Sequence, residues 1–152
     1  MEDFDPEGSI YERHQAVDRI AAAVEAARAL DFPFTLTARA ENHIRGNPDL
    51  HDTISRLQAY EEAGADVLYA PGLETVEEVR VVCGAVSRPV NVLALPGSSL
   101  SELAGAGAQR VSVGGGLTWI AVGAMVSAAT AIRDKGDLSS LATELPLERW
   151  LT

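Results

Sequence analysis

Residues 35–47, TLTARAENHIRGN, join a strand-like apolar pattern to a dense group of ionisable side chains. Arg39 and Glu41 come directly after the apolar alternation, and His43 follows them into a loop. A planar guanidinium matches the two oxygens of a carboxylate or the oxygens of a phosphate, and a histidine can transfer a proton near neutral pH. The stretch therefore indicates an anion-binding site at a strand end. A buried structural Arg39–Glu41 pair is the alternative interpretation.

Polar residues and glycines also occur within or at the ends of other predicted strands. Glu2 lies in MEDFD, a possible partial strand that could instead be a disordered acidic terminus. Asn91 interrupts the apolar run PVNVLAL, where a side-chain amide has no packing role unless it bonds to a neighbouring strand. Gly114 and Gly115, in SVGGG, expose backbone N–H groups that suit an anion at a helix N-terminus, or they form a tight turn.

The spacing of apolar residues predicts the elements that position these groups. Helices are expected over residues 11–30, 50–63, 75–86, 99–106 and 117–135, and strands over 32–38, 65–72, 88–97 and 109–116. Alternating strands and helices imply an α/β fold with a parallel sheet. Two near-repeats, EEAGADVLYAPG and ELAGAGAQRVSVGG, have the rhythm of a β/α barrel, although a closed barrel takes eight strands. In such a barrel the working residues lie at the C-terminal strand ends, which places Arg39 and Glu41 at the mouth.

Composition narrows the class of protein. The chain has 152 residues, a net charge of −10 and a sequence pI near 4.6, which argues against a nucleic-acid partner. Cys83 is the single cysteine and fits a reducing compartment as a packing residue. The longest apolar stretch, residues 119–129, is too short to span a bilayer. We expect a cytoplasmic protein with no membrane partner, folded as one domain over residues 1–152, with residues 136–152 as a C-terminal tail.

Three stretches together resemble one family: ARAENHIRGNPDLHDTISRLQAYEEAGADVLYAPGL, RPVNVLALPG and QRVSVGGGL. They are similar to the C-terminal part of the isocitrate lyase / phosphoenolpyruvate mutase (phosphonomutase) family. The resemblance implies part of a modified (β/α)8 barrel, about its last five strand–helix units, in homo-oligomers that exchange the last helix between subunits. It also implies Mg²⁺, a small 2-oxo or 2-hydroxy carboxylate substrate, and cleavage of a C–C bond, less often a P–C bond, through an enolate.

The same resemblance assigns roles to the polar residues. It makes Arg39 and Glu41 the catalytic pair, with Arg39 also binding substrate. Asn91, His43, Gly114 and Gly115 become substrate-binding positions, and from the residues alone His43 is favoured as a loop residue that shapes the mouth. Glu2 would hold a water on Mg²⁺.

The strands that carry the family's metal-binding aspartates have no counterpart here. We therefore expect either the C-terminal part of a longer protein or a shortened relative. A catalytically silent fragment or pseudoenzyme, acting in assembly or anion binding, is the alternative function.

Overall fold

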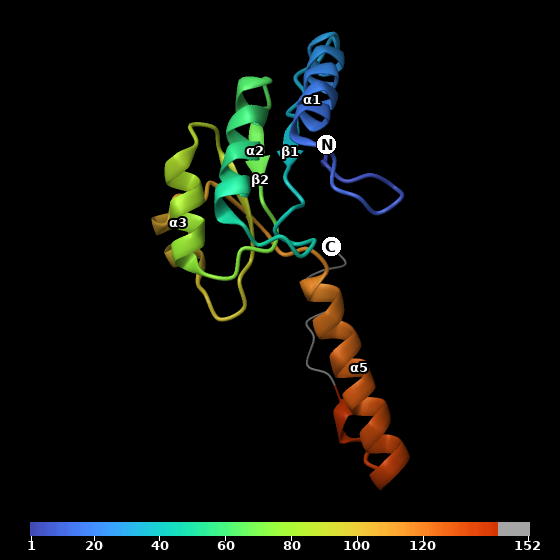
Figure 1. Ribbon diagram of the computed structural model, residues 1–152. Helices are drawn as coiled ribbons and strands as arrows, with labels where there is room; N and C mark the ends of the chain where they lie inside the picture. Colours follow the sequence, from blue (N-terminus) through green and yellow to red (C-terminus); the bar gives the residue numbers. More distant parts are fainter. Residues whose placement is uncertain (143–152) are drawn as a thin grey trace. The chain divides into compact units, whose positions relative to one another are not determined.

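The computed structural model describes residues 1–142, which fall into two compact units (Figure 1). The first unit, Met1–Ser112, contains a four-stranded parallel sheet in the order β1-β2-β3-β4. Its strands are β1 (Thr37–Arg39), β2 (Val67–Tyr69), β3 (Val90–Leu93) and β4 (Arg110–Ser112). The predicted α/β fold with a parallel sheet is confirmed.

The segment before β1 differs from its predicted form. A strand was expected over residues 32–38, but β1 begins only at Thr37. Phe32 and Phe34 are 55% and 47% exposed, so these two side chains do not form the buried face of a strand. Pro33 has no N–H to donate to a ladder. The expected partial strand in MEDFD is a single parallel bridge between Glu2 and Arg39.

Four helices accompany the sheet, each in the predicted place: α1 (Arg13–Arg28), α2 (Leu50–Glu62), α3 (Val76–Ala85) and α4 (Leu100–Gly105). They contact one another in chain order, and Figure 1 shows α2 and α3 side by side. Right-handed crossovers between sequential parallel strands place the helices on one face of the sheet. Side chains cap the starts of two of these helices: Asp49 accepts two backbone N–H groups of α2, and Thr75 and Glu78 form a capping box at α3.

The two faces of the sheet differ in burial. Alternate strand residues point toward the helices and are almost completely buried with them: Ala38, Leu68, Val90, Val92, Leu57, Tyr60, Val79, Val82 and Leu103. Cys83 packs against this core, and burial raises the pKa of its thiol. Thr37, Arg39, Val67 and Tyr69 face the other way and are half-buried. The chain therefore presents polar side chains on the face opposite its core.

Gly72, in the loop after β2, packs closely against the loop after β1. Its φ is +96°, and a Cβ at this position would lie 2.9 Å from the Cα and N of Ile44. Gly72→Ala is expected to lower the free energy of unfolding by about 3 kcal/mol, because it adds a clash to a strained backbone. Gly97→Ala is the matched control, since Gly97 has φ +89° but nothing within 4 Å. Equal losses for both variants in urea denaturation would contradict the close loop contact.

The second unit, Val113–Thr152, contains α5 (Gly116–Lys135) and a short 3-10 helix, η1 (Ser139–Leu141), among its described residues. α5 ends at Gly136 in the left-handed conformation. α5 is long and apolar enough to cross a membrane, but one such helix is weak evidence for a membrane protein. The expectation of no membrane partner therefore stays a prediction. The single domain over residues 1–152 also stays a prediction, and the tail after residue 142 lies outside the described residues.

Candidate functional site

One row of side chains crosses the polar face of the sheet. The register pairs Glu2 with Arg39, Arg39 with Tyr69, Tyr69 with Asn91, and Asn91 with Arg110. Residues in register on neighbouring parallel strands point to the same face, so these five side chains form a continuous row. The guanidinium of Arg39 lies over the Tyr69 ring, 5.2 Å from its centroid. The row therefore carries an arginine at each side of a Tyr–Asn pair.

Glu41 holds two arginines at the end of β1. Its side chain is completely buried, and its two carboxylate oxygens pair with Nε of Arg39 and, at 2.9 Å, with Nε of Arg45. The Arg39 side chain is still 30% exposed and lies 3.6 Å from the carboxylate of Glu2. The structural pair considered from the sequence thus exists, and it leaves the Arg39 side chain partly exposed. Substrate binding by Arg39 and catalysis by Glu41 stay predictions.

Arg39 lines a hollow of about 470 Å³ in the first unit. The other lining residues are Met1, Glu2, Phe4, Pro6, Arg19, Thr37 and Tyr69. The charged side chains of this lining are two arginines and one glutamate, and the excess of positive charge favours an anionic occupant. A hollow of about 490 Å³ lies elsewhere, between the ends of α2 and α3, where Glu61 is already bonded to Ser87. The hollow at Arg39 is the one that coincides with the row of polar side chains.

Asn91 is bonded to the next strand on both sides of its amide. It is 1% exposed, its Oδ1 accepts from Nη1 of Arg110 at 3.0 Å, and its Nδ2 donates to Oγ of Ser112 at 3.2 Å. This geometry is that of a core amide satisfied by a neighbouring strand, with the exposed Arg110 as its partner. A direct contact with substrate would need Asn91 to exchange one of these bonds, and it stays a prediction.

His43 lies in the loop after Glu41 and is 8% exposed. In the part of the chain that the structure describes, its Nδ1 has no hydrogen-bond partner, and neither has Oδ1 of the neighbouring Asn42. The amide nitrogen of Asn42 donates to Oγ1 of Thr53 at 2.8 Å, which fastens the loop to α2. His43 is not among the residues that line the hollow at Arg39. Its predicted role in substrate binding has no support from this placement.

Gly114 and Gly115 belong to the second unit. Gly114 has φ +52°, and Gly115 precedes α5 without a side-chain cap. The structure describes them within that unit and does not join them to the row at Arg39. Their assignment as anion-binding residues stays a prediction.

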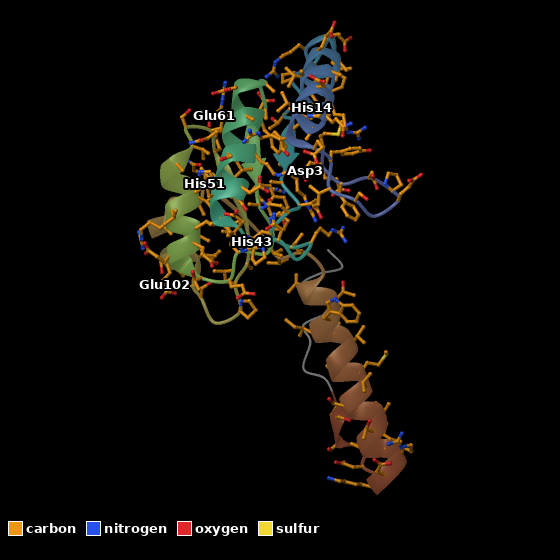
Figure 2. All side chains as sticks on the ribbon, viewed as in Figure 1. Asp3, His14, His43, His51, Glu61 and Glu102 are labelled. Atoms are coloured by element: carbon orange, nitrogen blue, oxygen red, sulfur yellow. The ribbon has the colours of Figure 1, made fainter. Side chains whose placement is uncertain are left out.

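Asp3 is a buried residue of this region that sequence reasoning left without a role. It is 2% exposed and lies beside β1, in contrast to the exposed His14 and His51 (Figure 2). Its carboxylate accepts hydrogen bonds from the Glu41 backbone and from Arg56 and Tyr60 of α2. An arginine within the buried stripe of a helix was the available signal, because such a charge needs a buried partner.

The Mg²⁺ site that the family resemblance implies would need oxygen ligands, most of them carboxylates. No group of three or more His, Cys, Asp or Glu side chains able to hold a metal occurs among residues 1–142. Glu2 is 54% exposed and lies next to Arg39, so it could contact a metal only as a single carboxylate or through water. The described residues therefore offer Glu2 as a single candidate carboxylate for Mg²⁺ and no preformed cluster of ligands.

The parallel sheet, its single layer of helices and the polar strand ends define an α/β protein with a candidate site at the C-terminal edge of the sheet. Residues 1–133 match the family model described as phosphoenolpyruvate phosphomutase, and the chain belongs to the phosphoenolpyruvate mutase/isocitrate lyase family. The predicted family is thereby confirmed. Its members include lyases, hydrolases and mutases.

Three relatives illustrate the match. The crystal structure of a candidate lyase/mutase from Burkholderia cenocepacia is 50% identical, with a TM-score of 0.91 over 99% of this chain and 57% of its own. Phosphonopyruvate hydrolase, solved with oxalate and Mg²⁺, is 27% identical, with a TM-score of 0.75 over 96% of this chain and 54% of its own. The 2-methylisocitrate lyase of Halalkalibacterium halodurans is 39% identical over 56 residues, 37% of this chain and 19% of the relative. The chain thus spans about half the length of the solved relatives.

Proposed function

We propose that this chain supplies the carboxylate-binding strand ends of a lyase that cleaves a C–C bond in a small 2-oxo or 2-hydroxy acid. The single observation that carries the proposal is the placement of Arg39. Its side chain lies at the end of β1, is 30% exposed, lines the hollow, and is held by the buried carboxylate of Glu41. A preorganised guanidinium next to an open hollow is suited to bind a carboxylate.

The charges around Glu41 support this role for Arg39. Because Arg45 also pairs with Glu41, the buried carboxylate has a second cation and does not depend on Arg39 alone. Arg19 adds a further positive charge to the lining of the hollow. An anionic occupant would therefore meet an excess of positive charge.

The proposed chemistry follows from the position of that charge. When a C–C bond breaks at the carbon adjacent to a carbonyl or carboxylate, the electron pair stays on that carbon as an enolate and the other fragment leaves as a carbonyl product. Positive charge nearby stabilises the enolate. Mg²⁺ would supply Lewis-acid chemistry when bound, as the complex of phosphonopyruvate hydrolase with oxalate and Mg²⁺ suggests. Glu2 would at most hold a water of that ion. Cleavage of a P–C bond is the less favoured variant.

The partner proposed for α5 is a second copy of the chain. None of the residues of α5 is buried, and large apolar side chains on it are exposed, among them Leu117, Trp119, Ile120 and Met125. Water-exposed apolar area of this kind favours burial in a homo-oligomer with exchanged helices. Sedimentation velocity at micromolar concentration is expected to show an oligomer, and a compact monomer would contradict this.

We also propose that the sheet is part of a modified β/α barrel in a cytoplasmic protein.

A catalytically silent role in anion binding or assembly is the second candidate. It is favoured by the lack of a metal-binding cluster among residues 1–142. The two candidates differ in turnover and agree on binding, so one experiment separates them.

The experiment combines oxalate binding with turnover in the protein that carries this chain. Oxaloacetate, 2-methylisocitrate, 2,3-dimethylmalate and phosphonopyruvate, which are named in relatives of this chain, are supplied with Mg²⁺ while release of the 2-oxo acid, oxalate or phosphate is measured. The lyase proposal predicts oxalate binding and turnover of a C–C substrate. Oxalate binding without turnover of any of them would favour the silent anion-binding role. No oxalate binding would contradict both the lyase and the anion-binding role and leave only assembly.

A further inference from the structure

The carboxylate of Asp3 connects α2 to the end of β1. Its Oδ1 accepts the backbone N–H of Glu41 at 2.7 Å. Its Oδ2 accepts from Nη1 of Arg56 at 3.1 Å and from the hydroxyl of Tyr60 at 2.5 Å. The carboxylate has no exposed side-chain area, so all of these bonds form away from water. One acidic side chain thus receives donors from two different elements.

The two donors on α2 fix the position of this carboxylate. Burial, together with the negative charge of Asp3, raises the pKa of Tyr60, so its hydroxyl stays protonated and donates at neutral pH. Arg56 is oriented by two further bonds, to Oδ2 of Asp52 at 3.1 Å and to the carbonyl of Tyr11 at 3.0 Å. Oδ2 is therefore anchored to α2, and Oδ1 faces Glu41.

The backbone of Asp3 also bonds to this part of the chain, along the same edge of β1. Its N–H donates to the carbonyl of Arg39 at 3.2 Å. The segment from Arg39 to Glu41 is thus bonded to Asp3 at both ends, once by a main-chain and once by a side-chain group. The directions in which the Arg39 and Glu41 side chains leave the backbone depend on these bonds.

We propose that Asp3 is a positioning residue of the anion site, which fixes Glu41 through its backbone N–H and, through Glu41, the guanidinium of Arg39. This inference rests on the proposed function, because it assumes that Arg39 binds the substrate carboxylate. Asp3 itself does not touch the ligand. An acid suits this position because three donors converge on its two oxygens, more than a neutral amide oxygen could accept with its NH₂ group beside it.

The experiment compares oxalate affinity in three variants at a temperature where circular dichroism shows each to be folded. Asp3→Asn should weaken oxalate binding by about tenfold, and Tyr60→Phe, which removes one donor, should weaken it by about threefold. Val82→Ala is the control, because Val82 is a fully buried residue of α3 that contacts the core and not the site. It should lose stability and keep the affinity of the wild type.

The outcomes separate this inference from the proposed function. If Asp3→Asn and Val82→Ala lose stability alike and both bind oxalate as the wild type does, Asp3 is only structural and the inference is wrong. If Asp3→Asn does not fold, an unchanged affinity in Tyr60→Phe overturns it. Normal binding by Arg39→Met would instead refute the proposed function, whatever the Asp3 variant does.

Discussion

Replacing Asp3 by alanine is expected to lower the free energy of unfolding by about 3 kcal/mol. The change removes the acceptor of three hydrogen bonds and leaves the Tyr60 hydroxyl and the Glu41 N–H without a partner in a buried place. Arg56 still forms its ion pair with Asp52 at 3.1 Å, so its charge remains paired. The loss of unfolding free energy therefore stays at the lower end of the range for broken buried ion pairs. Equilibrium urea denaturation at neutral pH measures this loss.

A matched aspartate provides the control for this prediction. Asp18 is exposed on α1, and Asp18→Ala should change the free energy of unfolding by less than about 0.5 kcal/mol. Since whole domains are stable by only about 5–15 kcal/mol, the expected loss for Asp3 is easily resolved. Similar stabilities for the two variants would show that the Asp3 network contributes little to folding.

The secondary structure was accessible from the sequence because it depends on local patterns. The near-repeats, each ending in a glycine turn, located β2 and β4, and Asp49 marked the start of α2. The exception is the segment before β1, where the predicted strand included Phe32 and Phe34 although both are exposed. Period alone cannot tell which face of a strand the rest of the fold covers.

The contacts of the site depended on pairing between distant segments and could only partly be predicted. Arg39 and Glu41 were recognised because they lie two residues apart at a strand end. Asp3 was missed because Arg56 and Tyr60 are 53 and 57 residues away and meet it only after α2 packs on β1. The partners of Asn91 follow from the register of β3 on β4, which no local pattern specifies.

Arg39→Met is expected to weaken oxalate binding by about ten- to a hundredfold, the value of one charge-assisted hydrogen bond. Its cost in stability should be about 1–2 kcal/mol, because Glu41 keeps Arg45 at 2.9 Å and is not left as an unpaired buried charge. A buried carboxylate without any partner would cost about 3–5 kcal/mol. Calorimetric titration and urea denaturation of the same preparation separate the two effects. A loss of the larger size, with oxalate affinity intact, would make Arg39 a structural residue.

The central claim is that Arg39 binds the carboxylate of the substrate, and a paired oxalate titration tests it most directly. Arg28→Met is the matched control. Arg28, the last residue of α1, pairs with Asp66 at 2.6 Å and does not line the hollow. Both variants and the wild type are titrated with oxalate in the same buffer containing Mg²⁺. We predict that Arg28→Met binds oxalate as the wild type does and that Arg39→Met binds it at least about tenfold more weakly. Equal affinity in the two variants would contradict the claim.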